Sequence, residues 1–261
     1  MQGVASVNDD NSLFVKSLAK AFQLLEAFEK SGDGGRLTHK EMKQLTGLDA
    51  STIQRLSHTL VQLGYLERGQ NRTYVLGKKF LHFTFEYLRH SQTIQRASPI
   101  LMDLQNETGE RIDLSLFEDV EIVYALRRQS KRETFFATLT GRRVPSFAAS
   151  GGRAVMSHLP RDVVEDILDR SNLVPQSPKT VTDRSGILAE IEKARDIGYA
   201  LCVEQMLIGE IVLASAIFDE RNTPIGAVHI AASLSDWDPE TFCRKHAPLA
   251  ISAARMISNR S

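Results

Sequence analysis

Five polar side chains within one short segment have the chemistry to contact nucleic acid: Ser51, Thr52, Gln54, Arg55 and His58. Their hydroxyl, amide, guanidinium and imidazole groups donate and accept hydrogen bonds of the kind that reach phosphates and base edges. The guanidinium of Arg55 can bond O6 and N7 of one guanine, and the amide of Gln54 can do the same for adenine. These residue types predict a segment that reads the major groove of DNA.

Apolar side chains occupy the opposite face of the same segment at helical spacing: Ile53, Leu56, Leu60 and Leu63. This period predicts an amphipathic helix whose apolar face belongs to a core. Asp49 is a natural N-cap for the helix, and Gly64 is placed to close it. The polar face is then left free for a partner.

Another short helix is predicted just before this one. Thr38 and Glu41 have the spacing of a capping box, so the helix is expected to start at His39, and Gly47 is placed to stop it. Two short helices joined by a tight turn make a helix-turn-helix, in which the second helix enters the major groove.

A polar turn at 68–72 then separates two short strand-like runs, which predicts a β-hairpin with a basic tip. A helix-turn-helix followed by such a hairpin is a winged helix. Arg68 and Arg72 on the wing, with Lys43, are expected to hold phosphates or enter the minor groove. Thr38 completes the candidate DNA-contacting set. The alternative is a small helical subdomain with a merely solvated polar face.

The composition is typical of a globular chain of one or two domains, with 261 residues, 42% hydrophobic and 25% charged. No long apolar run and no signal-peptide pattern is present, so we expect neither a membrane span nor export. The two cysteines, Cys202 and Cys243, have no metal or redox spacing and no visible base partner. A reducing cytoplasm is the expected location.

Net charge is zero, but the charge is unevenly distributed. Residues 17–80 hold ten Lys or Arg against six Asp or Glu, so the remainder of the chain is slightly acidic. A modestly basic module attached to an acidic one fits a DNA reader with a separate sensing part.

Four parts are predicted along the chain: a flexible tail at 1–12, a winged helix-turn-helix domain at 13–77, a linker helix at 78–95 and a second domain at 96–261. Ser17 is expected to cap a helix whose core face contains Leu18, Phe22, Leu25 and Phe28.

The linker helix is crowded with large apolar side chains: Phe80, Leu81, Phe83, Phe85, Tyr87 and Leu88. We expect them to pack against another subunit or domain, the alternative being an ordinary core helix of the second domain.

The second domain alternates between strand and helix patterns. Strands are expected at 112–117, 121–126, 134–139, 199–204, 211–218 and 225–232. Helices are expected at 100–108 after Pro99, 150–157, 163–170, 187–197 and from Asp238 to about 258. This order indicates an α+β domain built on one mainly antiparallel sheet with helices packed against its face.

The run Ser150-Gly151-Gly152-Arg153 opens one of these helices, and free N–H groups at a helix start are suited to a carboxylate. The alternative is a plain turn into a helix. Gly151-Gly152 lacks the Lys-Ser of a phosphate loop, and the seven histidines have no metal-ligand spacing. We therefore expect no catalytic residues, no metal and no cofactor. The pairs Arg127-Arg128 and Lys131-Arg132 are expected to be solvated charges.

With these motifs in order, the chain from about Ser17 to Ser258 resembles the IclR (isocitrate lyase regulator) family of bacterial transcription factors. The resemblance rests on the Ser17-Leu18 helix, the helix-turn-helix and the Tyr74-Val75-Leu76-Gly77 wing exit. It also rests on the helix start at Gly151–Val155 and the series from Gly198-Tyr199 to Phe218-Asp219.

The resemblance implies an N-terminal winged helix, a linker helix and a C-terminal GAF-like domain that binds a small effector. It also implies homodimers or homotetramers on pseudopalindromic double-stranded DNA operators, with the subunit two-fold matching half-sites about one helical turn, roughly 34 Å, or a multiple apart. The effector positions of the family correspond here to Gly151, Gly152, Cys202, Val212, His229 and Ala231, beside Ser150 in the same loop.

Relatives that bind small keto acids have an acidic group, a thiol and hydroxyls at the last four of these positions, where this chain has Cys, Val, His and Ala. A more apolar pocket suits an aromatic or otherwise hydrophobic carboxylic acid, held at the 150–153 loop with His229 as a polar partner. His229 has an alternative role as a satisfied sheet residue. A rival to the sensor is an architectural DNA-binding protein whose C-terminal domain only oligomerises.

Overall fold

A computed structural model describes residues 13–32, 34–129 and 140–258. The chain divides into two compact units, Met1–Tyr87 and Leu88–Ser261. Each unit has its own hydrophobic core, as expected for two domains that can fold separately.

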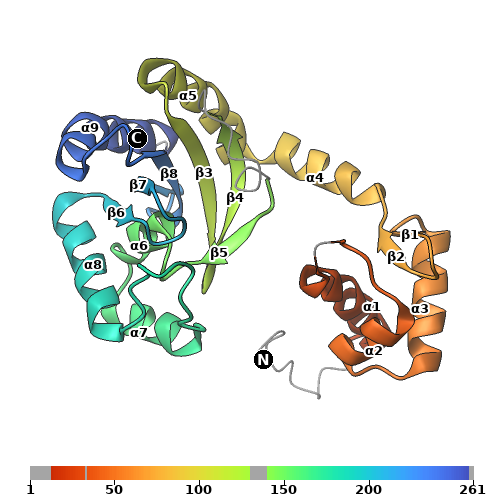
Figure 1. Ribbon diagram of the computed structural model, residues 1–261. Helices are drawn as coiled ribbons and strands as arrows, with labels where there is room; N and C mark the ends of the chain where they lie inside the picture. Colours follow the sequence, from red (N-terminus) through yellow and green to blue (C-terminus); the bar gives the residue numbers. More distant parts are fainter. Residues whose placement is uncertain (1–12, 33, 130–139, 259–261) are drawn as a thin grey trace. The chain divides into compact units, whose positions relative to one another are not determined.

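The first unit is a helix-turn-helix with a two-stranded wing (Figure 1). Its elements are α1 Lys16–Glu26, the 3₁₀ helix Ala27–Lys30, α2 His39–Thr46, α3 Ala50–Gln62, β1 Leu66–Arg68, β2 Tyr74–Leu76 and most of α4 Lys79–His90. In the wing, Leu66 pairs with Leu76, and Leu37 bridges to Tyr74 as a short third rung. The predicted winged helix is confirmed.

The caps of α2 and α3 are those that the sequence predicted. The Thr38 hydroxyl accepts the Glu41 N–H while the Glu41 carboxylate accepts the Thr38 N–H, which is the capping box. Asp49 caps α3 by accepting the Thr52 N–H at 2.9 Å. Gly47 ends α2 in the left-handed conformation, with φ of 72°.

Two predictions about α1 were wrong. Val15, not Ser17, occupies the N-cap, and no side chain bonds there. Leu18 and Phe22 are 55% and 54% exposed, while Leu24 and Phe28 fill the core. The stripe of Leu18, Phe22, Leu25 and Phe28 is therefore split, because only the end of α1 and the 3₁₀ helix that follows it pack into this core.

The predicted single helix over 78–95 and the restart at Pro99 were also wrong. The first helix, α4, ends at His90, and the Ser91 hydroxyl accepts the Ile94 N–H to begin α5, Gln92–Thr108. Pro99 lies inside α5 on its exposed side, so water can reach the carbonyl that the missing N–H leaves unpaired. The sequence pattern at Pro99 therefore indicated a boundary eight residues too late.

The second unit is built on one six-stranded antiparallel sheet of order β5-β4-β3-β8-β7-β6. The strands are β3 Arg111–Glu118, β4 Glu121–Arg128, β5 Arg143–Pro145, β6 Ala200–Val203, β7 Glu210–Phe218 and β8 Pro224–Ser233. The α+β class and the β3–β4, β6, β7 and β8 strand predictions are confirmed. The strand expected at 134–139 lies outside the described residues, and β5 is an additional strand that was not among the expected ones.

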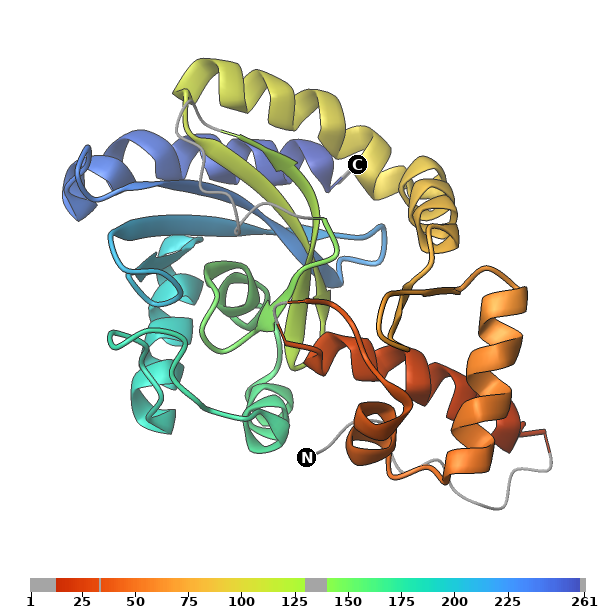
Figure 2. The same cartoon turned by 45° about the vertical axis from the view of Figure 1, so that its right-hand side comes forward.

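Helices cover both faces of this sheet (Figure 2). The helices α5 and α9 Pro239–Ile257 pack on one face over the main apolar core. On the other face, α6 Ser150–Met156 lies against the central strands, with α7 Arg161–Arg170 and α8 Arg184–Ile197 outside it. The second face carries the candidate ligand site.

Candidate functional site

The exposed face of α3 carries free hydrogen-bonding groups. Gln54, Arg55 and His58 are exposed, and none has a side-chain partner among the described residues. The buried face beneath them contains Ile53, Ser57 and Leu60, so packing fixes which side points outward. Leu63, expected in the core, is 51% exposed at the C-cap. This arrangement is that of a helix able to enter a groove.

Ser51 and Thr52 also lie at the start of α3, but their hydroxyls donate to the Asp49 carboxylate at 2.7 Å each. These bonds and the Thr52 N–H lower the pKa of Asp49 well below its ordinary value. The Ser51 and Thr52 oxygens therefore remain available mainly as acceptors. The Thr38 hydroxyl is similarly engaged, since it donates to Glu41 at 2.8 Å.

The wing presents Arg68 and Arg72 to solvent, as Lys43 is presented on α2. Asn71 and Arg72 adopt positive φ values of 53° and 57°, which make the tight turn at the tip. The Thr73 hydroxyl donates to the Gln70 carbonyl at 2.6 Å and closes that turn. The two basic side chains therefore project from a short, ordered hairpin.

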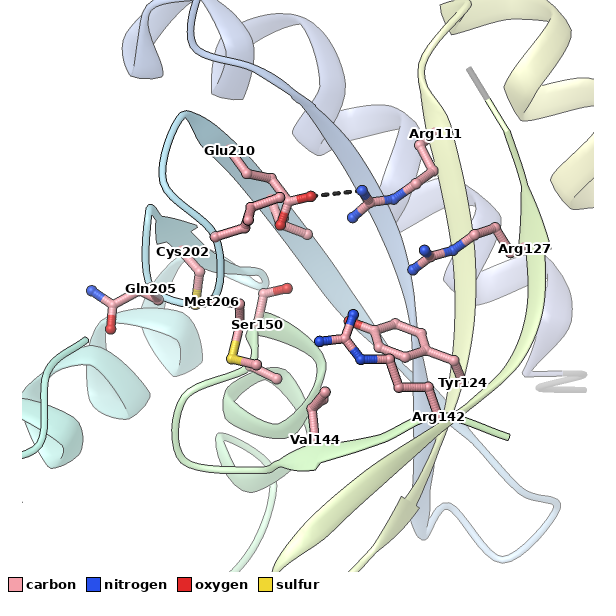
Figure 3. Close-up of a pocket in the computed structure, with 13 residues that line it drawn as sticks. Arg111, Tyr124, Arg127, Arg142, Val144, Ser150, Cys202, Gln205, Met206 and Glu210 are labelled. Atoms are coloured by element: carbon pink, nitrogen blue, oxygen red, sulfur yellow. Dashed lines mark hydrogen bonds and ion pairs between the residues drawn. The ribbon is translucent and has the colours of Figure 1, made fainter. Parts of the chain in front are cut away.

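In the second unit, a cavity of about 170 Å³ opens between β3, β4, the start of α6 and the loop that joins β6 to β7 (Figure 3). Its lining residues are Arg111, Tyr124, Arg127, Arg142, Val144, Ala149, Ser150, Cys202, Gln205, Met206, Leu207, Glu210 and Val212. Part of the wall is apolar and part is strongly charged, which is the composition of a pocket for a small amphiphilic ligand.

Two of the effector positions implied by the family resemblance, Cys202 and Val212, line this cavity, and so does Ser150 at the helix start. Gly151, Gly152, His229 and Ala231 are not among the lining residues. Of these, the two glycines serve close packing. A Cβ on Gly151 would lie 2.5 Å from the His229 ring, and one on Gly152 would lie 2.2 Å from the Ser146 carbonyl oxygen.

His229 is fully buried on β8 and satisfied by two hydroxyls. Its Nε2 lies 2.8 Å from Ser115 Oγ and its Nδ1 lies 3.3 Å from Ser150 Oγ. Burial lowers the pKa of His229 to about 4, so the ring is neutral at physiological pH. It supports Ser150, one residue of the lining, from behind.

Arginines dominate the polar wall of the cavity. Arg111 on β3 donates to Glu210 at 2.6 Å and to Asp113 at 3.1 Å. Arg127 on β4 donates to Asp113 through Nε at 2.5 Å and Nη2 at 2.9 Å. The expectation of solvated charge was wrong for Arg127, whose side chain is 5% exposed. These ion pairs hold the guanidinium groups beside the cavity.

A β-bulge explains why Arg127 reaches the pocket. Leu114 pairs with Leu126 but Ser115 pairs with Tyr124, so Ala125 is an extra residue in β4. The bulge shifts the alternation of faces, and Tyr124 and Arg127, an odd number of residues apart, both line the cavity. Strict alternation of faces along β4 would place Tyr124 and Arg127 on opposite sides of the sheet, so the sequence pattern did not indicate that they line one cavity. The signal that the sequence did offer was the two-residue spacing of Arg111 and Asp113, which places both charged side chains on one face of β3.

Arg153, the last residue of the run 150–153 that was expected to hold a carboxylate, is 1% exposed and contacts the β6–β7 loop. It donates to the Phe147 carbonyl at 2.7 Å and to Gln205 Oε1 at 3.1 Å. Gln205 also accepts the Val181 N–H at 2.9 Å. The β6–β7 loop is thereby fixed over the cavity. Burial raises the pKa of the neighbouring Cys202 thiol.

Other classes of site find no support in the described ranges. No group of three or more His, Cys, Asp or Glu in them could hold a metal ion. Within the same ranges, no helix has the length and hydropathy needed to cross a membrane.

Comparison with known proteins gives the family. Residues 85–259 match the family described as the bacterial transcriptional regulator IclR C-terminal domain, and residues 17–70 match the IclR helix-turn-helix domain. The HTH-type transcriptional regulator KipR of Bacillus subtilis is 26% identical over 216 residues, covering 83% of this chain and 85% of KipR.

Two more relatives cover nearly the whole chain. The p-hydroxybenzoate hydroxylase transcriptional activator of Acinetobacter baylyi is 25% identical over 251 residues, covering 94% of this chain and 92% of its own. A crystal structure of an IclR homolog from Microbacterium hydrocarbonoxydans, complexed with 4-hydroxybenzoate, has a TM-score of 0.74 at 24% identity. It covers 93% of this chain and 97% of that one. The winged helix, the sheet domain and these matches together show that the chain belongs to the IclR family of DNA-binding bacterial transcriptional regulators.

Proposed function

We propose that this regulator is ligand-responsive, and that a small organic acid bound in the second unit changes the affinity of the first unit for a pseudopalindromic operator. The observation that carries the DNA-binding half is the exposed set Gln54, Arg55 and His58 on a capped helix, whose side chains have no partner in the described part of the chain. A regulator, not an enzyme, is the function that this set supports.

The DNA contacts divide by chemistry. Arg55 is assigned to guanine and Gln54 to adenine, because each side chain can make paired bonds to one base edge. His58, with the acceptor oxygens of Ser51 and Thr52, completes the helix face. Lys43, Arg68 and Arg72, with Thr38, are assigned to the backbone or the minor groove.

The effector is assigned to the cavity beside Ser150, Cys202 and Val212. An aromatic or otherwise hydrophobic carboxylic acid fits a pocket with both apolar and cationic walls. Two relatives support this class through their names, one a p-hydroxybenzoate hydroxylase activator and one solved with 4-hydroxybenzoate. The packed Gly151 and Gly152, with His229 and Ala231, are assigned to shaping this pocket from behind.

A homodimer or homotetramer is proposed as the DNA-binding form. Four large side chains of α4 are exposed in the single chain: Leu81, Phe83, Phe85 and Tyr87. A second copy would cover such a surface and would place two α3 helices on two half-sites. A ligand that favours one arrangement of the second units would then change operator affinity. Because the proposed operator belongs to bacterial chromosomal DNA, the proposed location of the protein is the cytoplasm.

The experiment that tests the proposal is selection of genomic fragments by the purified protein, followed by footprinting. Two protected half-sites related by a two-fold axis, about one or two helical turns apart, are expected. Sedimentation of the free protein should give two or four chains. Protection without symmetry, or binding with no sequence preference, would instead favour an architectural DNA-binding protein.

A further inference from the structure

We propose that the pocket recognises a single carboxylate through Arg127 and Arg142, and that the rest of the ligand is an apolar body about the size of one aromatic ring. This inference rests on the proposed ligand-responsive function and deepens it. It moves the carboxylate from the start of α6 to the arginine wall formed by Arg111, Arg127 and Arg142.

The cavity size sets the size of the ligand body. Its volume is about 170 Å³. An apolar cavity of roughly 150 Å³ is already large enough to bind benzene. The apolar lining consists of Val144, Ala149, Met206, Leu207 and Val212. A two- or three-carbon acid would leave most of this wall uncovered.

An unpaired donor marks the place of the carboxylate. Arg127 donates hydrogen bonds from Nε and Nη2 to Asp113, but its Nη1 is buried and has no hydrogen-bond partner among the described residues. Buried N–H groups are seldom left without an acceptor. In Figure 3 the Arg127 guanidinium reaches toward the cavity, and its carbon lies 5.0 Å from the centre of the Tyr124 ring.

Arg142 supplies the second cation. Its guanidinium lies beside Tyr124 on the cavity side in Figure 3, and it has no ion-pair partner within the described part of the chain. Exposed at the rim, it can close over a carboxylate that enters toward Arg127. Two guanidinium groups and the neutral phenol of Tyr124, whose pKa burial raises, make a compact set of hydrogen-bond donors for an anion.

Among the lining side chains and Asp113, the charge balance favours a ligand with one carboxylate. The three lining arginines face two carboxylates, Asp113 and Glu210, which leaves one positive charge unbalanced. Arg111 is already bonded to both acids, and the buried His229 is neutral. A monocarboxylate cancels the excess, whereas a dicarboxylate would bring an uncompensated negative charge into the pocket.

The start of α6 is a poorer carboxylate site. Its Ser150 hydroxyl already interacts with His229 at 3.3 Å, and Gly151 and Gly152 are buried by packing. The unpaired Nη1 of Arg127 and the guanidinium of Arg142, which has no ion-pair partner among the described residues, lie on the opposite wall (Figure 3).

The test is calorimetric titration of the full-length protein with benzoate, and with benzamide as its neutral isostere, phthalate as a dianion and pyruvate as a small acid. Benzoate should bind, and the other three should bind roughly tenfold more weakly or worse. Benzamide lacks the charged hydrogen bond, phthalate brings a second, uncompensated negative charge, and pyruvate lacks the apolar contact. Equal binding of benzamide, or no binding of benzoate, would overturn the inference.

Variants assign the residues. Arg142→Gln should weaken benzoate roughly tenfold or more while leaving the thermal unfolding midpoint close to wild type. Arg127→Lys keeps a positive charge beside Asp113 but removes Nη1, and it should also weaken benzoate. The matched control is Arg143→Gln, whose side chain pairs with Glu118 and Glu121 and does not line the cavity. Unchanged benzoate affinity in Arg142→Gln would overturn the assignment.

Operator binding by the wild-type protein, measured in the same preparation, separates this inference from the proposed function. If benzoate binds through Arg142 but operator affinity does not respond, the sensor proposal fails and the carboxylate site stands. If operator affinity responds to a neutral compound and not to benzoate, the sensor stands and the carboxylate site fails.

Discussion

Arg127 and Asp113 face each other across the β3–β4 pair, joined by hydrogen bonds of 2.5 Å from Nε and 2.9 Å from Nη2. The Asp113 carboxylate is 0% exposed and also accepts a bond from Arg111. One buried carboxylate thus orients two arginines of the pocket. It does so because a buried charge must be both paired and hydrogen-bonded.

Removing one member of this buried pair should therefore destabilise the second unit. Arg127→Met is expected to lower the free energy of unfolding by about 3 kcal/mol, since Asp113 would keep only Arg111. Urea denaturation followed by the fluorescence of Trp237 measures the change. The double variant Arg127→Met with Asp113→Leu should lose less than the two single variants together. Strict additivity of the two losses would contradict the pairing.

His229 gives a pH dependence whose sign follows from its pKa. The folded protein holds this residue at a pKa of about 4, below its ordinary value of 6.5, because burial disfavours the charged ring. The unfolded chain binds the proton first, so stability is full above pH 6.5 and falls as pH drops toward 4. The loss from this residue is about 3 kcal/mol, at about 1.4 kcal/mol per pKa unit.

The variant His229→Asn isolates this contribution. Urea midpoints between pH 7.5 and 4.5 should fall less steeply in the variant than in the wild type. His246, whose pKa burial also lowers to about 4, remains in both proteins and cancels in the difference. Parallel pH profiles for the two proteins would show that His229 is not held neutral.

Gly152 tests whether the glycine pair serves packing. In Gly152→Ala the new Cβ would meet the Ser146 carbonyl oxygen at 2.2 Å, so the backbone must shift. A loss of about 1–3 kcal/mol in unfolding free energy is expected. Gly32→Ala is the control, because a Cβ there meets nothing within 4 Å. If Gly152→Ala kept wild-type stability but bound the acid more weakly, Gly152 would be a ligand contact and not a packing residue.

Base reading and phosphate holding are separable in DNA binding. Arg55→Ala should weaken operator binding by about 1–3 kcal/mol and random DNA much less, because the paired bonds to one base are lost. Lys43→Ala should weaken binding to operator and to random DNA equally. It should also lower the slope of log affinity against log salt concentration by about one, since one fewer counterion is released. Competition titrations at several salt concentrations measure both effects. Equal weakening of both DNAs by Arg55→Ala would remove its base-reading role.

Local rules predicted the first unit well because its signals are short-range. The capping box at Thr38, the Asp49 cap and the stop at Gly47 each act within four residues. The failures in this unit came from long-range choices. Whether Leu18 and Phe22 are buried depends on which turn of α1 meets the rest of the core, and their spacing does not determine that.

The pocket was only partly predictable for a related reason. Ser150, predicted from its place at a helix start, and Cys202 and Val212, predicted from family resemblance, do line the cavity, but Arg111, Arg127 and Arg142 were missed. The bulge at Ala125 reverses the outward face of β4, and cross-strand pairing with Asp113 buries a guanidinium that composition alone assigns to water.

The central claim is that an acid bound in the second unit alters DNA binding by the first. Its most direct test is fluorescence anisotropy of the full-length protein on DNA from upstream of its own coding sequence, with and without saturating benzoate and other aromatic and aliphatic acids. Specific binding is expected, with a midpoint that shifts roughly fivefold or more with an aromatic monocarboxylate. Specific binding that none of these acids changes would contradict it.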